Sequence, residues 1–599
     1  MGRGWIVMVG VVLLTLFTNR LSAQPTLKLI GNNIDVSSGL TVQRRSPSVA
    51  YNSSNNEYMV VWFDLRNVAT TGNDVFAQRL SVSGGLLGAN IPIVTDVGAQ
   101  FNPFVAYNSS DNNYLVAWQS QFDGPGSPDF NDAFGRLVSN AGVPLGGAFH
   151  ISDGGSEISI AYNSASNEYL TTGRSFASGP IPGIFGQIIS NGGFLIGTEI
   201  VINTAGASAP NGQIIYNPTI NEYFSTWRDQ VEGNLKGQRI SATGVLLGNP
   251  IIISPVFPQS SNPTASIAFD PANNRYLIVF SRFQGTDILG QFVASSGGLI
   301  GSNFLIRTAS SPTATPSVAH SSIDNVFLLV WNDSNDILGQ LLSETGQVIG
   351  TPLVLANQTA AAFLRPTTVH NTKSGDFLVA WSDNRNVSQG EQDIFAQLVG
   401  ISRSTTLTYT GATSGDFHDS VHLSARLTLD GSSTPIANQM ITFAIGTQSC
   451  TGNTDASGLA TCHLTLSQIP GSYTVSASFA AAGLFEASNA SALFTIRREE
   501  TTLSYTGDLA ITIVLPARLS GVLLEDGLVP IPGRSVIFTL GTGSSAQTCT
   551  GVTDAAGIAA CTIFPVNQPL GLNVVTDDFA GDPFYLPSTH HAATAIFPP

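Results

Sequence analysis

The sequence predicts an all-β protein: a seven-bladed β-propeller followed by two β-sandwiches. The first observation is a pattern, roughly P-x-V-A-Y-N-x-x-x-N-E-Y-L-V-x-W, that occurs seven times along the chain of 599 residues. The second is an unrelated, longer repeat that occurs twice after it. The third is the composition, with 60 glycines and only 11% charged residues. Such a mixture favours strands and tight turns over helices.

One aromatic or histidine residue marks the same place in each copy of the first repeat. The step between successive markers shortens gradually from 56 to 50 residues, and the markers are Tyr51, Tyr107, Tyr162, Tyr216, Phe269, His320 and His370. A repeat of this length, made of short strands, is typical of a propeller, in which each copy forms one blade.

Within one copy, strands are expected over residues 47–51, 58–62, 74–80 and 91–95. Such a four-stranded meander cannot bury both of its faces alone, but it can when it is stacked on copies of itself. A tryptophan follows the opening aromatic of the second strand by four residues in five copies (Trp62, Trp118, Trp227, Trp331 and Trp381). Packing between blades explains these rings best. A stacking platform for sugars is the alternative.

The seventh copy lacks a fourth strand before the composition changes near residue 403. Residues 29–37, which precede the first copy, match the pattern of the fourth strand over residues 87–95. We therefore expect the amino-terminal segment to complete the last blade of a propeller that spans 24–403. Such closure removes an exposed strand edge, which would otherwise invite aggregation.

The first 23 residues have the features of a signal peptide. Arg3 supplies the positive charge, Trp5 to Phe17 form the apolar region, and Leu21-Ser22-Ala23 offers small residues for cleavage before Gln24. An uncleaved membrane anchor is the alternative, but the apolar run is short for a bilayer span. We expect a secreted or cell-surface protein with no transmembrane segment in the mature chain.

The charge balance argues against a nucleic-acid partner. The chain has 24 basic and 40 acidic residues, so its formal net charge is −16. A surface with this balance repels a phosphate backbone.

The second repeat starts near Ser404. Residues 405–411 recur as 501–507, and each copy holds two of the chain's four cysteines at the same spacing: Cys450 with Cys462, and Cys549 with Cys561. In a secreted protein, two local disulfides are the natural pairing. The turn between the cysteines is typical of a hairpin, so each disulfide is expected to join two neighbouring strands. A zinc site is the alternative, although the usual C-x2-C pairs are absent.

Alternating strands in units of this size fit β-sandwiches, and Arg497 to Glu500 form a short charged link between the two. On the pattern C-x-G-x-T-D-A-x-G-x-A-x-C, residues 404–599 resemble the bacterial immunoglobulin-like domains of surface adhesins and invasin-type proteins. The resemblance implies immunoglobulin-like domains over 404–498 and 499–599, a stalk or spacer role, and no catalytic residue. The front part resembles the propeller-type repeat regions of bacterial secreted proteins that carry Y-L-V-V-W…D-I-x-A-Q units.

The catalytic motifs that can be recognised by spacing are absent from the sequence. There is no G-x-S-x-G, H-E-x-x-H, P-loop or dinucleotide-binding loop in its required context. We expect no catalytic residue, no cofactor and no metal site.

The candidate site lies in long loops between the second and third strands of copies seven, one and two. Copies one and seven share W-x-D-x-R-N there. The candidate ligand-binding residues are Asp64, Arg66, Asn67, Asp123, Asp383, Arg385 and Asn386. One interpretation is a polar site for a glycan or acidic polymer, because binding residues concentrate on loops of rigid scaffolds. The other is an Asp–Arg pair that orders each loop.

Three functions remain open. The leading hypothesis is a secreted or cell-surface, non-catalytic binding or adhesion protein whose propeller presents a face to a glycan or a surface protein. The second is an extracellular carbohydrate-active enzyme, a hydrolase or lyase, with Asp64, Asp123 and Asp383 as candidate acid and base groups. The third is a structural surface component.

Overall fold

The computed structural model describes residues 25–37, 43–121, 132–175, 183–204, 207–208, 213–254, 264–281, 286–310, 314–357, 365–385 and 392–599. The predicted signal peptide over residues 1–23 lies outside these ranges. The described residues are almost entirely strands, and none of their helices is long and apolar enough to cross a membrane. The chain divides into two compact units, Met1–Ser402 and Arg403–Pro599.

The described residues of the first unit form seven antiparallel sheets, which we number in chain order. Sheet 1 holds β2 (Arg44–Asn52), β3 (Glu57–Asp64), β4 (Asp74–Ser81) and β5 (Leu86–Val94). Sheet 2 holds β6 (Gln100–Asn108), β7 (Asn113–Ser120), β8 (Asp132–Ser139) and β9 (Pro144–Ser152). Sheet 3 holds β10 (Gly155–Asn163), β11 (Glu168–Ser175), β12 (Gly183–Ser190) and β13 (Leu195–Asn203).

Sheet 4 has a divided first strand. It holds β14 (Ala207–Ser208), β15 (Ile214–Asn217), β16 (Glu222–Asp229), β17 (Asn234–Ser241) and β18 (Leu246–Ile252). Sheet 5 holds β19 (Ala265–Asp270), β20 (Arg275–Ser281), β21 (Asp287–Ala294) and β22 (Leu299–Thr308). Sheet 6 holds β23 (Ser317–Ser321), β24 (Val326–Asp333), β25 (Asp336–Ser343) and β26 (Val348–Asn357).

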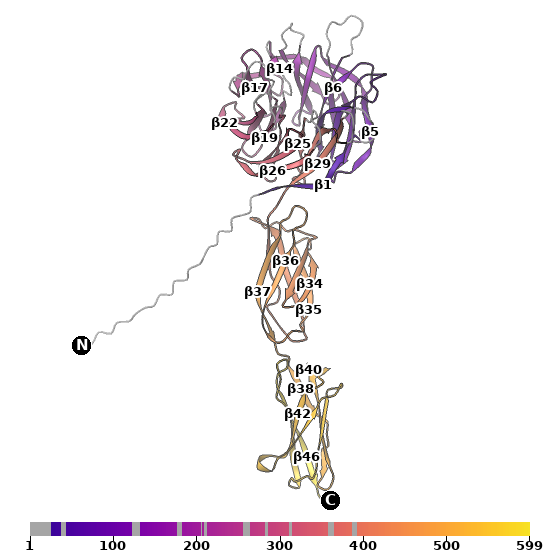
Figure 1. Cartoon of the computed structure of the whole chain (residues 1–599), viewed down its shortest axis with the longest axis vertical. Coiled ribbons are helices and arrows are strands. Elements are labelled where there is room, and N and C mark those ends of the chain that lie inside the picture. The colour runs from indigo at the N-terminus through magenta and orange to yellow at the C-terminus, as the bar shows by residue number, and fades with distance from the viewer. Residues whose placement is uncertain are drawn as a thin grey trace, which may run out of the picture. The chain divides into compact units, whose positions relative to one another are not determined.

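Sheet 7 combines strands from the two ends of the unit. It holds β27 (Thr367–His370), β28 (Phe377–Asp383), β29 (Asp393–Ile401) and, as its outer strand, β1 (Leu27–Asp35). β1 pairs antiparallel with β29 from Leu27 opposite Ile401 to Asp35 opposite Phe395. In Figure 1 the indigo β1 lies beside the salmon β29. The hydrogen bond from Val36 N to Ile394 O, at 2.9 Å, extends this pairing.

Seven apolar clusters hold the sheets together, and each cluster is shared by two consecutive sheets. One of them joins sheet 7 to sheet 1, where Trp62 and Tyr58 pack with Leu378 and Ile394. The sheets therefore form a closed ring, the β-propeller expected from the repeat (Figure 1). The five repeated tryptophans lie in these clusters and are 1% exposed or less, so they serve packing between the sheets.

The repeated asparagine at the end of the innermost strand links each of several sheets to the next one. Asn52 Nδ2 donates to the hydroxyl oxygen of Tyr114 at 3.0 Å, and its Oδ1 accepts the turn N–H of Asn55 at 2.8 Å. Asn371 of sheet 7 donates in the same way to Tyr58 of sheet 1, at 3.2 Å. These bonds satisfy buried polar groups at the interfaces and repeat across the seam of the ring.

The second unit contains two sheets in each of its two repeats. In the first repeat, β30 (Thr405–Tyr409), β32 (Ser420–Leu429) and β35 (Leu459–Thr465) form one sheet. The other sheet holds β31 (Ser414–Asp416), β37 (Ser488–Arg497), β36 (Gly471–Phe479), β33 (Met440–Ile445) and β34 (Gln448–Asn453). Buried side chains from both sheets, such as Leu423 and Phe443, form the core between them.

The second repeat has the same arrangement. One sheet holds β38 (Thr501–Tyr505), β40 (Ala517–Glu525), β41 (Val529–Pro530) and β44 (Ile558–Ile563). The other holds β39 (Ala510–Thr512), β46 (Ser588–Phe597), β45 (Gly571–Phe579), β42 (Ser535–Leu540) and β43 (Gln547–Val552), and the short η1 (Gly543–Ser545) precedes β43. Each repeat is thus a β-sandwich, the packing expected when two sheets each bury one face.

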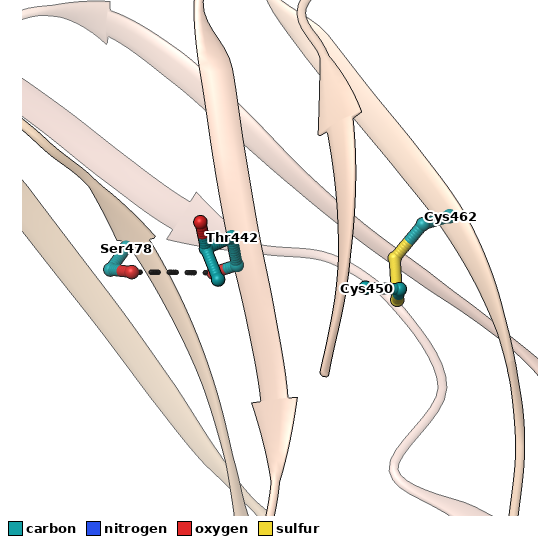
Figure 2. Close-up of a disulfide and its surroundings, with 4 residues drawn as sticks. All are labelled: Thr442, Cys450, Cys462 and Ser478. Carbon is teal, nitrogen blue, oxygen red and sulfur yellow. Dashed lines mark hydrogen bonds between the residues drawn. A yellow bond between two sulfur atoms is a disulfide. The ribbon is translucent and has the colours of Figure 1, made fainter. Parts of the chain in front are cut away.

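Both expected disulfides are present, Cys450–Cys462 and Cys549–Cys561. Their place in the fold differs from the predicted hairpin. Cys450 lies in β34, which pairs with β33, whereas Cys462 lies in β35, which pairs with β32 of the opposite sheet. Figure 2 shows the bond running between these two strands. Each disulfide therefore joins the two sheets of a sandwich, because the turn between the cysteines carries the chain from one sheet to the other.

Candidate functional site

A central cavity of about 230 Å³ lies where the innermost strands begin, and residues from all seven sheets line it. One position of the repeat, six residues before the asparagine or its replacement at the end of the innermost strand, supplies a lining residue in six sheets. We call these the ring residues: Ser46, Asn102, Glu157, Thr264, Thr315 and Arg365. In sheet 4 the equivalent Asn211 lies outside the described residues, and Gln213 lines the cavity.

Several of the ring residues lie at irregular points of the backbone, where the strand pairing shifts or φ is positive. The pairing of the innermost strand with the next one shifts register beside Ser46, Asn102 and Glu157. The same three residues have φ values of 53°, 46° and 53°, and Arg365 has a φ of 27°. A bulge re-aims a side chain that a regular strand would place elsewhere, and such strained residues concentrate at functional sites.

Charged groups face one another across the cavity. Arg365 lies two residues before β27 of sheet 7, and Glu157 lies in β10 of sheet 3; these two sheets are not neighbours in the ring. Arg365 is solvent-exposed, yet desolvation by the protein around the cavity lowers the pKa of its guanidinium; the charge of Glu157 raises that pKa and the charge of Arg45 lowers it. The cavity therefore contains a cation and a carboxylate that interact electrostatically. The remaining ring residues add hydroxyl and amide groups to its lining.

The W-x-D-x-R motif of sheet 1 forms a compact local cluster. Asp64 is fully buried and its carboxylate accepts hydrogen bonds from Trp62 Nε1 at 3.0 Å, Arg66 N at 2.8 Å and the Arg66 guanidinium at 2.6 Å. Burial alone would raise the pKa of Asp64, but the bonds from Arg66 and Trp62 outweigh it and hold that pKa below its usual value. Asn67 in turn donates to Asp74 Oδ2 at 2.6 Å.

The motif of sheet 7 repeats this arrangement. Asp383, also fully buried, accepts from Trp381 Nε1 at 3.0 Å and from Arg385 N at 2.8 Å. Arg385 donates to Asn33 Oδ1 at 2.6 Å and lies over the ring of Phe395, as Arg66 lies over Phe76.

These contacts match the interpretation in which an Asp–Arg pair orders each loop. As acceptors for an external ligand, the carboxylates of Asp64 and Asp383 are unsuited, because both are buried and already bonded within the protein. The guanidiniums of Arg66 and Arg385 stay partly exposed, with side chains 18% and 27% accessible. Asp123 and Asn386 lie outside the described residues.

The ring residues were not predicted from the sequence, because the prediction relied on residues that recur in most copies of the repeat. The ring position varies between the copies: Ser, Asn, Glu, Asn, Thr, Thr and Arg in chain order. A polar residue at this position in every copy, with a charge in only two of them, was the available signal.

Comparisons with known proteins give little beyond the fold. No family model matches the chain, and no curated protein matches it. Among solved structures, an α-L-arabinanase of Penicillium chrysogenum complexed with arabinobiose is 12% identical over 62% of this chain and 98% of its own, with a TM-score of 0.36. The Dos1 propeller is 8% identical over 62% and 95%, with a TM-score of 0.36.

The extracellular region of plexin A4 is 8% identical and covers 95% of this chain and 84% of its own, with a TM-score of 0.39. Likenesses this distant say nothing about what this chain binds. The propeller fold follows from the strand pairing and the packing of the chain itself.

Proposed function

We propose that this chain is a secreted or cell-surface binding protein whose propeller holds a glycan at the central cavity, while the two sandwiches act as an immunoglobulin-like stalk. The observation that carries the proposal is the composition of the cavity lining. Each sheet contributes a polar side chain to the lining of the cavity. Among these side chains, Glu157 provides a charged acceptor and Arg365, from a non-adjacent sheet, a charged donor.

The chemistry of this lining suits sugar hydroxyl groups. Hydroxyl, amide, carboxylate and guanidinium groups converge on one space, and the proline rings that follow four of the ring residues supply apolar wall: Pro47, Pro103, Pro316 and Pro366. A few placed polar groups in a concave, partly apolar wall are the usual features of a ligand site. The volume lies below the common range of about 300–1,000 Å³. A single sugar unit or the end of a glycan chain fits it best.

Binding accounts for this lining better than two-carboxylate hydrolysis does. Most glycoside hydrolases place two carboxylates about 5–10 Å apart around the scissile bond. Among the described lining residues, Glu157 is the one acidic side chain. The two disulfides suit an oxidising, extracellular location.

The test is a glycan array probed with the mature chain from Gln24, followed by binding titrations of each hit. Arg365→Ala and Glu157→Ala should each weaken binding at least tenfold, since each removes a charged hydrogen-bonding partner. Arg307→Ala is the matched control, because Arg307 is an exposed arginine on the outer strand β22. Undiminished binding by both cavity variants would overturn the proposal. Hydrolysis of a hit by the wild type, lost in Glu157→Ala, would establish the enzymatic alternative.

A further inference from the structure

Three carboxylates converge at the start of the second sandwich. Glu499 and Glu500 directly precede β38, and Asp526 lies in the turn after β40. One carboxylate oxygen from each of the three residues lies within 4.8 Å of those from the other two. Glu525, the last residue of β40 and the chain neighbour of Asp526, adds a fourth carboxylate, which accepts a hydrogen bond from the Tyr585 hydroxyl at 3.3 Å.

Glu499 is the unusual member of this group. It is 1% exposed, and its Oε2 finds no hydrogen-bond donor among the described residues. The backbone fixes its position, since Glu499 N donates to Phe584 O at 2.9 Å and Leu586 N donates to Glu499 O at 2.8 Å. A buried, unpaired carboxylate oxygen is costly, and native structures rarely retain one without a ligand or functional reason.

The nearby cations of this region are engaged elsewhere. Arg497 pairs with Asp416 at 2.8 Å, and Arg534 pairs with Asp582 at 2.6 Å. Among the described residues, none of the carboxylates of Glu499, Glu500 and Asp526 forms a salt bridge, whereas Glu525 lies 3.1 Å from His418 Nδ1.

The first sandwich provides an internal comparison. The two repeats are offset by 96 residues, so Glu499, Glu500, Glu525 and Asp526 correspond to Arg403, Ser404, Leu429 and Asp430. The formal charge of these four positions is zero in the first sandwich, where Arg403 offsets Asp430, and −4 in the second. The first sandwich thus folds with one acidic residue, Asp430, at these four positions, and the other three carboxylates belong to the second copy alone.

We propose that Glu499, Glu500 and Asp526 bind a calcium ion. Calcium takes six to eight oxygen ligands in flexible geometry, and carboxylates, backbone carbonyls and water supply them. An ion placed between these three carboxylates would give the buried Glu499 Oε2 a partner and offset the local charge. With only three protein carboxylates, the expected dissociation constant is on the order of 10⁻⁴ to 10⁻³ M, the range of extracellular calcium modules. This site is independent of the propeller cavity.

The test is calorimetric titration of the metal-free mature chain with calcium chloride, together with its thermal unfolding. One calcium ion should bind. At about 10 mM calcium, well above the expected dissociation constant, one unfolding transition should rise by about 5 °C, because only the folded sandwich binds the ion. Magnesium chloride serves as the comparison ion, and tighter binding of magnesium than of calcium would overturn the assignment.

Two variants and a control locate the site. Glu499→Gln and Asp526→Asn should each abolish both the binding heat and the calcium-dependent shift. Asp430→Asn, the same change at the equivalent place of the first sandwich, should alter neither. Glu499→Gln keeps the size and shape of the side chain and avoids an unpaired buried carboxylate, so it should fold at least as well as the wild type without calcium. Absence of calcium binding to the wild type, or binding that survives both variants, would overturn the proposal.

Discussion

Arg44, in the innermost strand of sheet 1, donates a hydrogen bond from its guanidinium to the carboxylate of Asp393 in sheet 7. The same guanidinium bonds to Asp64 at 3.1 Å, and the side chains of Arg44 and Asp64 are completely buried. Arg44 N also donates to Gln392 O at 2.9 Å. A cation shared between two carboxylates thus lies at the place where the last sheet meets the first.

Arg44→Ala should destabilise the propeller by about 3–5 kcal/mol, because it leaves two buried carboxylates without their shared cation. Denaturant unfolding of the full chain measures the change. Arg79→Ala is the control: Arg79 pairs with Glu57 inside one sheet and is 20% exposed, so its loss should cost about 1 kcal/mol. Equal effects of the two variants would contradict a special role for Arg44 at the seam.

His370 should make the propeller sensitive to acid. Burial, with a smaller contribution from His320, lowers the pKa of His370 from 6.5 to about 4. The unfolded chain therefore takes up a proton between these values that the folded chain does not, so stability is full above pH 6.5 and falls as the pH drops towards 4.

The shift corresponds to a loss of about 3 kcal/mol across this window. His370→Phe should remove that loss, since Phe269 occupies the equivalent place in sheet 5. Urea unfolding at pH 7 and pH 5 gives the comparison, and the exposed His422→Phe is the control. An unchanged difference between the two pH values in His370→Phe would disprove this explanation.

Replacing Cys450 and Cys462 together with serine should lower the stability of the first sandwich by about 2–4 kcal/mol, because the disulfide restricts the unfolded chain and ties its two sheets. The equivalent change at Cys549 and Cys561 should affect the second sandwich instead. Calorimetry of both variants separates the transitions. If either change shifted both transitions equally, the two sandwiches would unfold as one unit.

Arg66→Ala should lower the unfolding free energy by about 1 kcal/mol, because it removes a hydrogen bond and a ring contact that order the loop after β3. Glycan binding should stay unchanged, in contrast to Arg365→Ala. Titration of the same array hit with both variants makes the comparison. If Arg66→Ala lost glycan binding and Arg365→Ala kept it, the binding site would lie in the loop after β3 and not in the central cavity.

The sequence predicted the features that repeat and missed those that depend on a single copy. The strands, the buried Trp62 and its equivalents, and the cysteine pairs follow from periodicity and spacing. The approach of Glu157 to Arg365 does not, because it depends on the ring bringing together residues 208 positions apart and on bulges that no composition rule places. The role of the disulfides was misjudged because a turn sequence does not tell whether the chain returns to the same sheet or crosses to the other.

Glu499 illustrates a second limit. Arg497 to Glu500 have the composition of a solvated link, yet the bonds of Glu499 to Phe584 and Leu586 bury it. Only the comparison of the two repeats at this position, arginine against glutamate, hinted at a specialised role.

The central claim is that seven sheets close into a ring, and that β1, from the start of the chain, forms the outer strand of the last sheet. Calorimetry of the mature chain without residues 24–37 tests it most directly. We predict a marked fall in the melting temperature of the propeller, with aggregation as the edge of β29 becomes exposed. A propeller transition at the temperature of the intact chain would contradict the closed ring, and with it the cavity formed by the ring residues.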